Sequence, residues 1–265
     1  MFIKILVCLA IMISVSAFRG IPRIARSFSS LAVTTSTAGE AGTESFRVKF
    51  ADGGKDISPW HDIPLKDGDL FNFVNEIPKY TKAKMEVATK EESNPIAQDM
   101  KKGKLRDYHG PIFWNYGCLP QTWEDPNVEN PDVKAFGDND PVDVVEIGSA
   151  VLETGSVTKV KVLGVLAMID DGELDWKVLA IKSDDPLAAE LNDVADVEAK
   201  CPGTVSGIRE WFRWYKTPDD KPLNAFGFNE ECLPKAKALE VIEETHGHWK
   251  ALKDGTTDKG KLWLN

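Results

Sequence analysis

The alternation of apolar and polar positions predicts strands over most of the central chain. Phe46, Val48 and Phe50 alternate with polar residues, which is typical of a strand with one buried face. Apolar runs predict further strands at 71–74, 84–88, 142–147, 157–169 and 176–181. Asp171-Gly172 falls between the last two runs and predicts a two-residue hairpin turn. Residues 89–110 are polar and predict loops and turns.

Helical periodicity appears late in the chain. Asp185-Pro186 followed by residues 187–191 predicts a short helix, and apolar residues at helical spacing predict a second helix over 202–215. A third, amphipathic helix is predicted around residues 239–249. Many strands followed by helices predict an α+β fold that is mainly β. The apolar content of 42% suits one large domain, which we expect over 44–265.

The first 43 residues predict a targeting sequence rather than part of the fold. Residues 1–17 contain Lys4, a largely apolar run and a small-residue end at Ala17, which is typical of a signal peptide. This apolar run is too short for a stable membrane span. Residues 18–43 are rich in Arg, Ser and Thr, have no acid before Glu40, and predict a transit peptide or linker without stable structure.

A signal peptide joined to a transit-like segment resembles the two-part targeting sequence of complex plastids. The Ser-Ala-Phe junction that ends at Phe18 resembles the motif found there in diatoms and related algae. Plastid localisation is therefore the prediction. A mitochondrial presequence is the alternative, although the uninterrupted apolar run disfavours it, and secretion is third.

Charge and cysteine content exclude several classes of protein. The net charge is −10, and since residues 1–43 hold four basic residues against one acid, the remainder carries about −13. So acidic a body is a poor partner for nucleic acid, and it needs metal ions to attract a polyanionic substrate. The four cysteines have no CxxC spacing, which argues against zinc and against a disulfide framework. They are Cys8, Cys118, Cys201 and Cys232.

Acidic residues gather in two segments that the strand pattern brings together. Asp138, Asp140 and Asp143 lie within six residues at the start of a predicted strand. Asp170 and Asp175 flank the predicted hairpin turn. So many carboxylates beside apolar residues are costly to desolvate unless cations collect there. An all-oxygen ligand set favours magnesium or manganese.

The segment 137–148, Gly-Asp-Asn-Asp-Pro-Val-Asp-Val-Val-Glu-Ile-Gly, fits the Asp-x-Asp-Pro-x-Asp pattern of family I soluble inorganic pyrophosphatases. The chain resembles their eukaryotic and plastid branch in order from about Phe46 to about Lys253. Supporting blocks lie at 76–80, 84–86, 101–106, 115–117, 120–126, 170–177 and 210–216. The resemblance implies a closed five-stranded, OB-like barrel with flanking helices. It also implies hydrolysis of pyrophosphate to two orthophosphates with several Mg²⁺ ions, for which Mn²⁺ is a possible substitute.

The resemblance also implies roles for individual residues. Asp138, Asp143 and Asp175 match the ligands of a first metal, and Asp140 matches the general base. Asp170 and Glu86 match ligands of metals that arrive with the substrate, with Glu76 and Glu173 in the outer shell. The substrate-binding residues implied are Lys84, Arg106, Tyr116, Lys177, Tyr215 and Lys216, of which Tyr116 is also expected to be catalytic.

One position departs from the family pattern, and rival functions fit less well. Eukaryotic relatives have an active-site tyrosine where Ile112 stands here, so this role is absent or is filled by Tyr108. An EF-hand beginning at Asp138 lacks the glycine that its sixth position requires. An aspartyl-phosphate phosphotransferase lacks the apolar strand before its first Asp, and a silent binding protein would not need so many charged motif positions. The four histidines are interpreted as structural or surface residues, and the protein is expected to be a monomer or a homodimer.

Overall fold

The computed structural model describes residues 32–265. The predicted signal peptide at 1–17 and the transit segment up to residue 31 lie outside the described residues. The strands of the described part are β1 (Val33–Ala38), β2 (Arg47–Asp52), β3 (Lys55–Ile57), β4 (Lys66–Asp67), β5 (Leu70–Ile77), β6 (Met85–Val87), β7 (Ile96–Gln98), β8 (Met100–Lys101), β9 (Lys104–Leu105), β10 (Asn115–Cys118), β11 (Asp143–Glu146), β12 (Val157–Asp170), β13 (Glu173–Lys182), β14 (Ala225–Phe226) and β15 (Leu233–Pro234).

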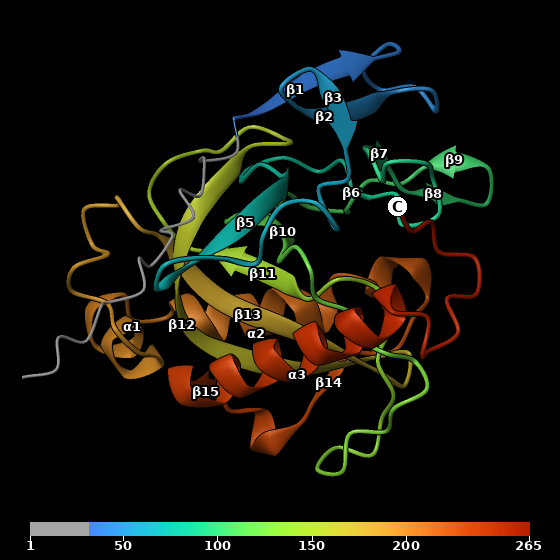
Figure 1. Ribbon diagram of the computed structural model, residues 1–265. Coiled ribbons are helices and arrows are strands. Elements are labelled where there is room, and N and C mark those ends of the chain that lie inside the picture. The colour runs from blue at the N-terminus through green and yellow to red at the C-terminus, as the bar shows by residue number, and fades with distance from the viewer. Residues whose placement is uncertain (1–31) are drawn as a thin grey trace, which may run out of the picture. The chain divides into compact units, whose positions relative to one another are not determined.

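Five of these strands pair in a series that returns to its start. β5 pairs with β10 and β10 with β11, both antiparallel, and β11 then pairs in parallel with β13. β13 forms the predicted hairpin with β12, and β12 pairs with β5. Figure 1 shows these strands at the centre of the described part. Gly117 of β10 permits this pairing, because a Cβ atom there would lie 2.0 Å from the carbonyl oxygen of Val74.

A smaller sheet, with the strand order β1-β2-β7-β6, adjoins this ring, and β3 pairs with the edge of β2. β1 corrects the sequence prediction, because it falls inside the segment 18–43 that was expected to lack structure. Its six residues pair in register with β2, from Val33 opposite Asp52 to Ala38 opposite Arg47. The β-branched run Val33-Thr34-Thr35 favours a strand once a partner edge is present. β7, β8 and β9 likewise lie in the predicted loop region 89–110.

The helices are α1 (Val194–Lys200), α2 (Thr204–Trp214) and α3 (Lys235–Lys253), with short 3₁₀ turns at Thr217–Asp219 and Phe228–Glu230. The predicted second and third helices are confirmed. The predicted helix at 187–191 is wrong, because these residues form only turns. Five residues are too few to nucleate a stable helix, and Asp193 begins α1 soon afterwards with a capping box formed with Asp196.

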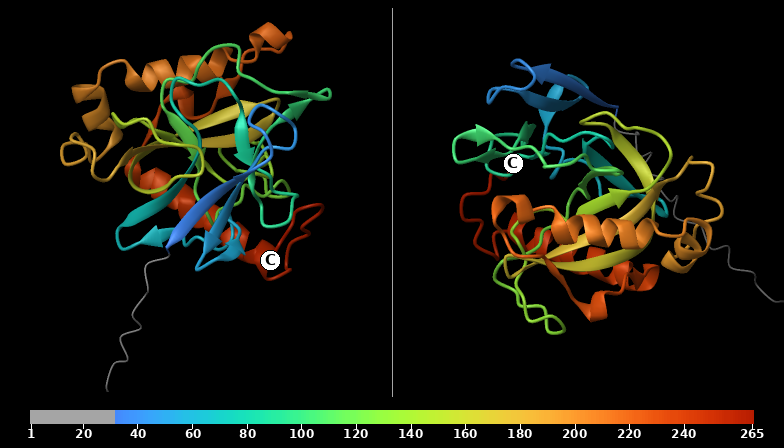
Figure 2. Two further views of the ribbon diagram at one scale, coloured as in Figure 1. Left: turned by 90° about the horizontal axis from the view of Figure 1, so that it is seen from above. Right: turned by 180° about the vertical axis from the view of Figure 1, so that it is seen from behind.

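Both faces of the long strands are buried, each beneath a different helix. Leu163 and Leu179 pack in a cluster with Phe212 of α2, whereas Val162 and Val178 pack in a cluster with Ile242 of α3. Figures 1 and 2 show α3 in front of β13 and α2 behind it. Burial on both faces explains why residues 157–169 form a nearly continuous apolar run. None of the helices over 32–265 has the length and apolar character that crossing a membrane requires.

Candidate active site

A cavity of about 150 Å³ opens where β5, β6, β10, β11, β13 and the end of α2 meet. Charged side chains of both signs line it. The acids are Glu76, Glu86, Asp138, Asp140, Asp143, Asp170 and Asp175, and the cations are Lys84, Arg106, Lys177 and Lys216. The acidic residues predicted from two separate segments therefore share one cavity.

Strand register brings the acidic segments together. Asp143, the first residue of β11, lies opposite Lys177 of the parallel strand β13. Asp175 precedes Lys177 by two residues, so the two side chains are on the same face of β13. The predicted hairpin turn is confirmed, because Asp171 and Gly172 adopt φ values of 50° and 95° between β12 and β13. This turn requires a positive φ at both positions, which Gly adopts freely and Asp tolerates.

Lys177 joins two of the predicted metal ligands. Its side chain is 2% exposed, and Nζ donates to Asp143 Oδ2 at 2.5 Å and to Asp175 Oδ1. The Tyr116 hydroxyl donates to the same Asp143 oxygen. Burial raises the pKa of Asp175 to about 7 and the nearby Asp143 charge acts in the same direction, although Lys177 opposes both effects. The buried lysine thus offsets part of the repulsion between two carboxylates.

The other cations of the cavity are also paired with acids. Lys84 bonds to Glu86, which is two residues away on the same face. Lys216 bonds to Asp170, and the Tyr215 hydroxyl donates to Asp170 Oδ2 at 3.0 Å.

Asp99 holds two of these cations, although the sequence did not point to it. Arg106 Nη1 donates to Asp99 Oδ2 at 2.9 Å, and Lys84 Nζ lies 3.4 Å from the same oxygen. Asp99 follows β7 without a motif of its own, so sequence reasoning missed it. Its carboxylate fixes the position of the planar guanidinium group at the cavity.

Asp140 lies at the open edge of the cavity, in the loop before β11. Its backbone N–H donates to Asp138 Oδ1 at 3.0 Å, which fixes the turn between the two acids. The side chain keeps contact with solvent. The surrounding protein nevertheless removes part of its hydration, and together with the Glu86 charge this raises the pKa of Asp140 to about 7. A carboxylate with such a pKa is suited to accept a proton near neutral pH.

The two predicted outer-shell residues differ in position. Glu76 is buried beside the cavity and accepts a hydrogen bond from the Val87 N–H at 2.7 Å. Burial raises its pKa well above the usual value, and the Asp143 charge adds to the effect. Glu173 is exposed at the start of β13 and does not line the cavity, so its role stays a prediction.

The departure from the family tyrosine pattern is visible at the cavity. Ile112 is fully buried in the apolar core and does not line the cavity. Tyr108 does line it, and the Tyr108 ring packs edge-on against Tyr215 with 5.7 Å between centroids. Tyr108 is therefore at the cavity and Ile112 is not, which leaves Tyr108 as the candidate for the missing role.

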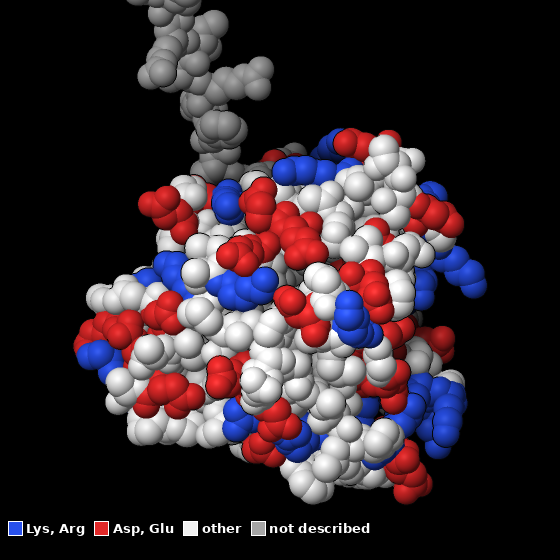
Figure 3. All heavy atoms as spheres, turned by 90° about the horizontal axis from the view of Figure 1, so that it is seen from below, with Lys and Arg blue, Asp and Glu red and all other residues white. Residues whose placement is uncertain are grey.

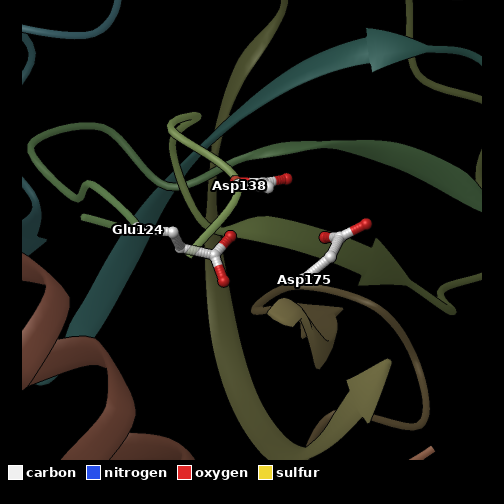
Figure 4. Close-up of side chains that lie close together, drawn as sticks. All are labelled: Glu124, Asp138 and Asp175. Atoms are coloured by element: carbon white, nitrogen blue, oxygen red, sulfur yellow. The ribbon is translucent and has the colours of Figure 1, made fainter. Parts of the chain in front are cut away.

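Three carboxylates face a common space beside the cavity (Figure 4). They belong to Glu124, Asp138 and Asp175, and each offers an oxygen within 4.8 Å of the other two. Two of the three match the predicted first-metal ligands, whereas the third predicted ligand, Asp143, is joined to Asp175 through Lys177. Carboxylate oxygens so close together fit a hard divalent cation. Glu124 lies in the matched block 120–126, and no pattern in that block distinguishes it from its neighbour Asp125.

A cavity in which carboxylates alternate with Lys and Arg side chains is typical of enzymes that act on phosphoryl groups, because it accommodates cations and phosphate together. The family profile described as inorganic pyrophosphatase matches residues 73–250. The chain is 57% identical over 229 residues to the chloroplastic soluble inorganic pyrophosphatase 6 of Arabidopsis thaliana, covering 85% of this chain and 76% of the relative. It is 58% identical over 211 residues to the chloroplastic soluble inorganic pyrophosphatase 1 of Chlamydomonas reinhardtii, covering 79% and 75%.

The fold agrees with this similarity. The crystal structure of type I inorganic pyrophosphatase from Toxoplasma gondii superimposes with a TM-score of 0.81 at 53% identity, covering 83% of this chain and 99% of that chain. The structure of inorganic pyrophosphatase from Schistosoma japonicum gives 0.84 at 45% identity, covering 86% and 84%. This chain belongs to the inorganic pyrophosphatase family.

Proposed function

We propose that this protein hydrolyses inorganic pyrophosphate to two orthophosphates and so drives biosynthetic reactions that release pyrophosphate. One observation carries the proposal: seven carboxylates and four cationic side chains line a single cavity. The cations suit the phosphate oxygens of the substrate, and the carboxylates suit the metal ions that accompany it. The pyrophosphatases of similar sequence support this substrate.

The acidic side chains would hold several Mg²⁺ ions, with Mn²⁺ as a possible substitute. Asp138, Asp143 and Asp175 are the proposed ligands of the first ion, and Asp170 and Glu86 of ions that arrive with the substrate. The donor set fits, because every group is a hard carboxylate oxygen and Glu124 Oε2 is a buried oxygen without a hydrogen-bond partner among the described residues. Such ions lower the pKa of bound water and neutralise charge on the leaving phosphate.

The remaining side chains would bind the phosphates and move the proton. Lys84 and Lys216 offer point charges, whereas Arg106 offers a planar fork that matches two phosphate oxygens. Asp140 is the proposed general base, and it removes the proton from the attacking water. The hydroxyl groups of Tyr116 and Tyr215 would donate hydrogen bonds to phosphate. Glu76 and Glu173 remain the proposed outer-shell residues, and Lys177 the cation that balances the acids.

Phosphate release from pyrophosphate tests this function. The purified protein should release phosphate in Mg²⁺ and at a different rate in Mn²⁺. It should release none in Ca²⁺, because the larger and more flexible coordination sphere of calcium misplaces the attacking water. Chelator should abolish the reaction. Full turnover in excess chelator contradicts metal-dependent hydrolysis, and no release under any metal condition contradicts the function itself.

The ring of five paired strands supports the OB-like barrel that the family resemblance implies, with α1, α2 and α3 as its flanking helices. The proposed catalytic domain covers 44–265, and β1 precedes it as an added strand. The proposed signal peptide at 1–17 and the transit segment from 18 to 43 would be processed during delivery, before the domain acts. Because β1 falls at the end of that segment, cleavage that preserves β1 must occur before residue 33.

The proposed destination is the plastid, with the mitochondrion as the alternative. The two chloroplastic relatives favour the plastid. A fluorescent protein fused to residues 1–17 should enter only the secretory route, and one fused to 1–43 should reach a complex plastid. Phe18→Ala in the longer fusion should stop the reporter short of the stroma without blocking entry. Delivery of the 1–43 fusion to mitochondria in the native cell type refutes the plastid address.

No nucleic acid and no membrane partner is proposed after processing. The face shown in Figure 3 mixes basic side chains with acidic ones, which gives little attraction for a phosphate backbone. The proposed partner is therefore the small substrate with its metal ions. The protein is proposed to be a monomer or a homodimer, which analytical ultracentrifugation distinguishes.

A further inference from the structure

Glu124 has a buried carboxylate in which only one oxygen has a hydrogen-bond partner among the described residues. The residue is 3% exposed and lies in the loop between β10 and β11. Oε1 accepts a hydrogen bond from the Trp176 N–H of β13 at 2.9 Å. Oε2 has no hydrogen-bond partner among the described residues. A buried carboxylate oxygen without a partner is costly, so its environment calls for a cation or a proton donor.

The carboxylate of Glu124 faces two other carboxylates. Oxygens of Glu124, Asp138 and Asp175 lie within 4.8 Å of one another, and Figure 4 shows them carried by three different segments. Three acids in this arrangement repel one another, and a divalent cation among them removes the repulsion.

The backbone of Glu124 fixes the loop that carries Asp138. The Glu124 N–H donates to the Asp140 carbonyl at 3.0 Å, and the Asn139 N–H donates to the Glu124 carbonyl at 2.9 Å. Gly137 permits this approach, because a Cβ atom there would lie 2.4 Å from the Glu124 carbonyl carbon. Glu124 therefore contacts the 137–140 loop through its backbone and β13 through its side chain.

We propose that Glu124 is a positioning residue of the metal centre, and that its Oε2 oxygen sets the affinity for the divalent cation held by Asp138 and Asp175. This adds a supporting residue beside the ligands Asp138, Asp143 and Asp175 that the family resemblance implies. The inference rests on the proposed metal-dependent function. It explains why a glutamate is buried between two segments whose acids serve the same ion.

Glu124→Gln tests the proposal, because it keeps the shape and the Oε1 bond but removes the charge and replaces an oxygen by an NH₂ group. Full-length protein is titrated with Mn²⁺, and free Mn²⁺ is read by electron paramagnetic resonance. Loss of a group that supports metal ligands typically weakens affinity about 10–100-fold, and this loss is expected at one class of sites. Pyrophosphate hydrolysis by the variant should need correspondingly more metal, with kcat largely recovered at saturation.

Asp125→Asn is the matched control. Asp125 is the next residue and is 5% exposed, but its Oδ1 oxygen already accepts hydrogen bonds from Asn127. Its change should leave Mn²⁺ affinity within about twofold of the parent, since it is not among the clustered acids. Near-ultraviolet circular dichroism verifies the fold of each variant. If Glu124→Gln does not fold, Glu124→Asp is titrated, and its shorter side chain should weaken binding by withdrawing the oxygen.

Several results overturn the inference. Mn²⁺ affinity of a folded Glu124 variant within twofold of the parent means that Oε2 does not face the ion. An equal loss in Asp125→Asn means that general negative charge, and not the position of Glu124, sets the affinity. Absence of Mn²⁺ binding by the parent refutes the proposed metal-dependent function instead, so the two failures are distinguishable.

Discussion

Asp140→Asn is expected to remove the general base while preserving the shape of the site. Its side chain lies at the cavity edge, and the turn is held by the backbone bond to Asp138, which the substitution leaves in place. Loss of a general base costs about 10²–10⁴-fold in rate. In terms of the activation barrier this is roughly 3–5 kcal/mol. Metal binding should change little, because the clustered carboxylates of Glu124, Asp138 and Asp175 remain.

The pH profile distinguishes this role from a structural one. Burial and the Glu86 charge raise the pKa of Asp140 to about 7 without metal, and nearby cations lower it. Because a base acts only when deprotonated, kcat of the parent should rise with pH along an acidic limb at or below pH 7. Asp140→Asn should lose that limb, whereas the exposed control Asp132→Asn should match the parent. Activity within about threefold of the parent with an unchanged profile would refute the assignment.

Three further outcomes are expected for the metal-free and truncated protein. Lys177→Met should lower the free energy of unfolding by about 3–5 kcal/mol in urea with chelator, because the buried Asp175 and the half-buried Asp143 lose their cation, and Mg²⁺ should restore part of it. Since the pKa of Asp175 is raised to about 7, its carboxyl group stabilises the metal-free fold fully below about pH 4, and this stabilisation is lost as the pH rises toward 7. The loss, on the order of 4 kcal/mol in metal-free denaturation curves, should reverse with Mg²⁺. Protein lacking residues 1–43 should melt about 2–4 °C below protein lacking 1–31, because β1 is mostly exposed and contributes roughly 1 kcal/mol; equal melting temperatures contradict a stabilising β1.

The strands that were predicted correctly are those whose local sequence and tertiary environment agree. The runs at 157–169 and 176–181 are long and apolar, and the Asp171-Gly172 turn fixes their register, so β12 and β13 follow from local rules. β10 was not predicted, because Asn115–Cys118 is short and buried on both faces and so has no alternation. Its pairing depends on the close approach at Gly117, which is a tertiary effect.

The wrong elements show where local signals are insufficient. Residues 187–191 follow Asp185-Pro186, which resembles a helix start. The Asp185 side chain accepts hydrogen bonds from the N–H groups of Leu187 and Ser149, and no helix follows at these residues. β1 has the reverse character. Its Ser and Thr content resembles a linker, and only the edge of β2 turns it into a strand.

The candidate site was predictable where a motif carries it. Asp138, Asp140 and Asp143 stand in one motif. The two-residue period of side chains along strands predicted that Asp175 would lie near them, and all four line the cavity. Glu124 and Asp99 were missed, because neither stands in the acidic motif and the partners of each are far away in sequence. Their positions depend on long-range packing, and no local pattern distinguishes them from solvated acids.

The pairing of charges inside the cavity implies that metal and phosphate favour each other's binding. Lys84 is paired with Glu86, Lys216 with Asp170, and Lys177 with Asp143 and Asp175, so proposed phosphate ligands neutralise proposed metal ligands. A phosphate that draws Lys84 or Lys216 away leaves a carboxylate with one cation fewer, which raises its affinity for a metal ion. A metal ion that binds the carboxylate frees the lysine for phosphate. It raises the affinity for phosphate by the same factor, since coupling between two binding equilibria is reciprocal. The acidic protein can therefore bind a polyanion without a surplus of basic residues, because the metal ions and the released lysines act together.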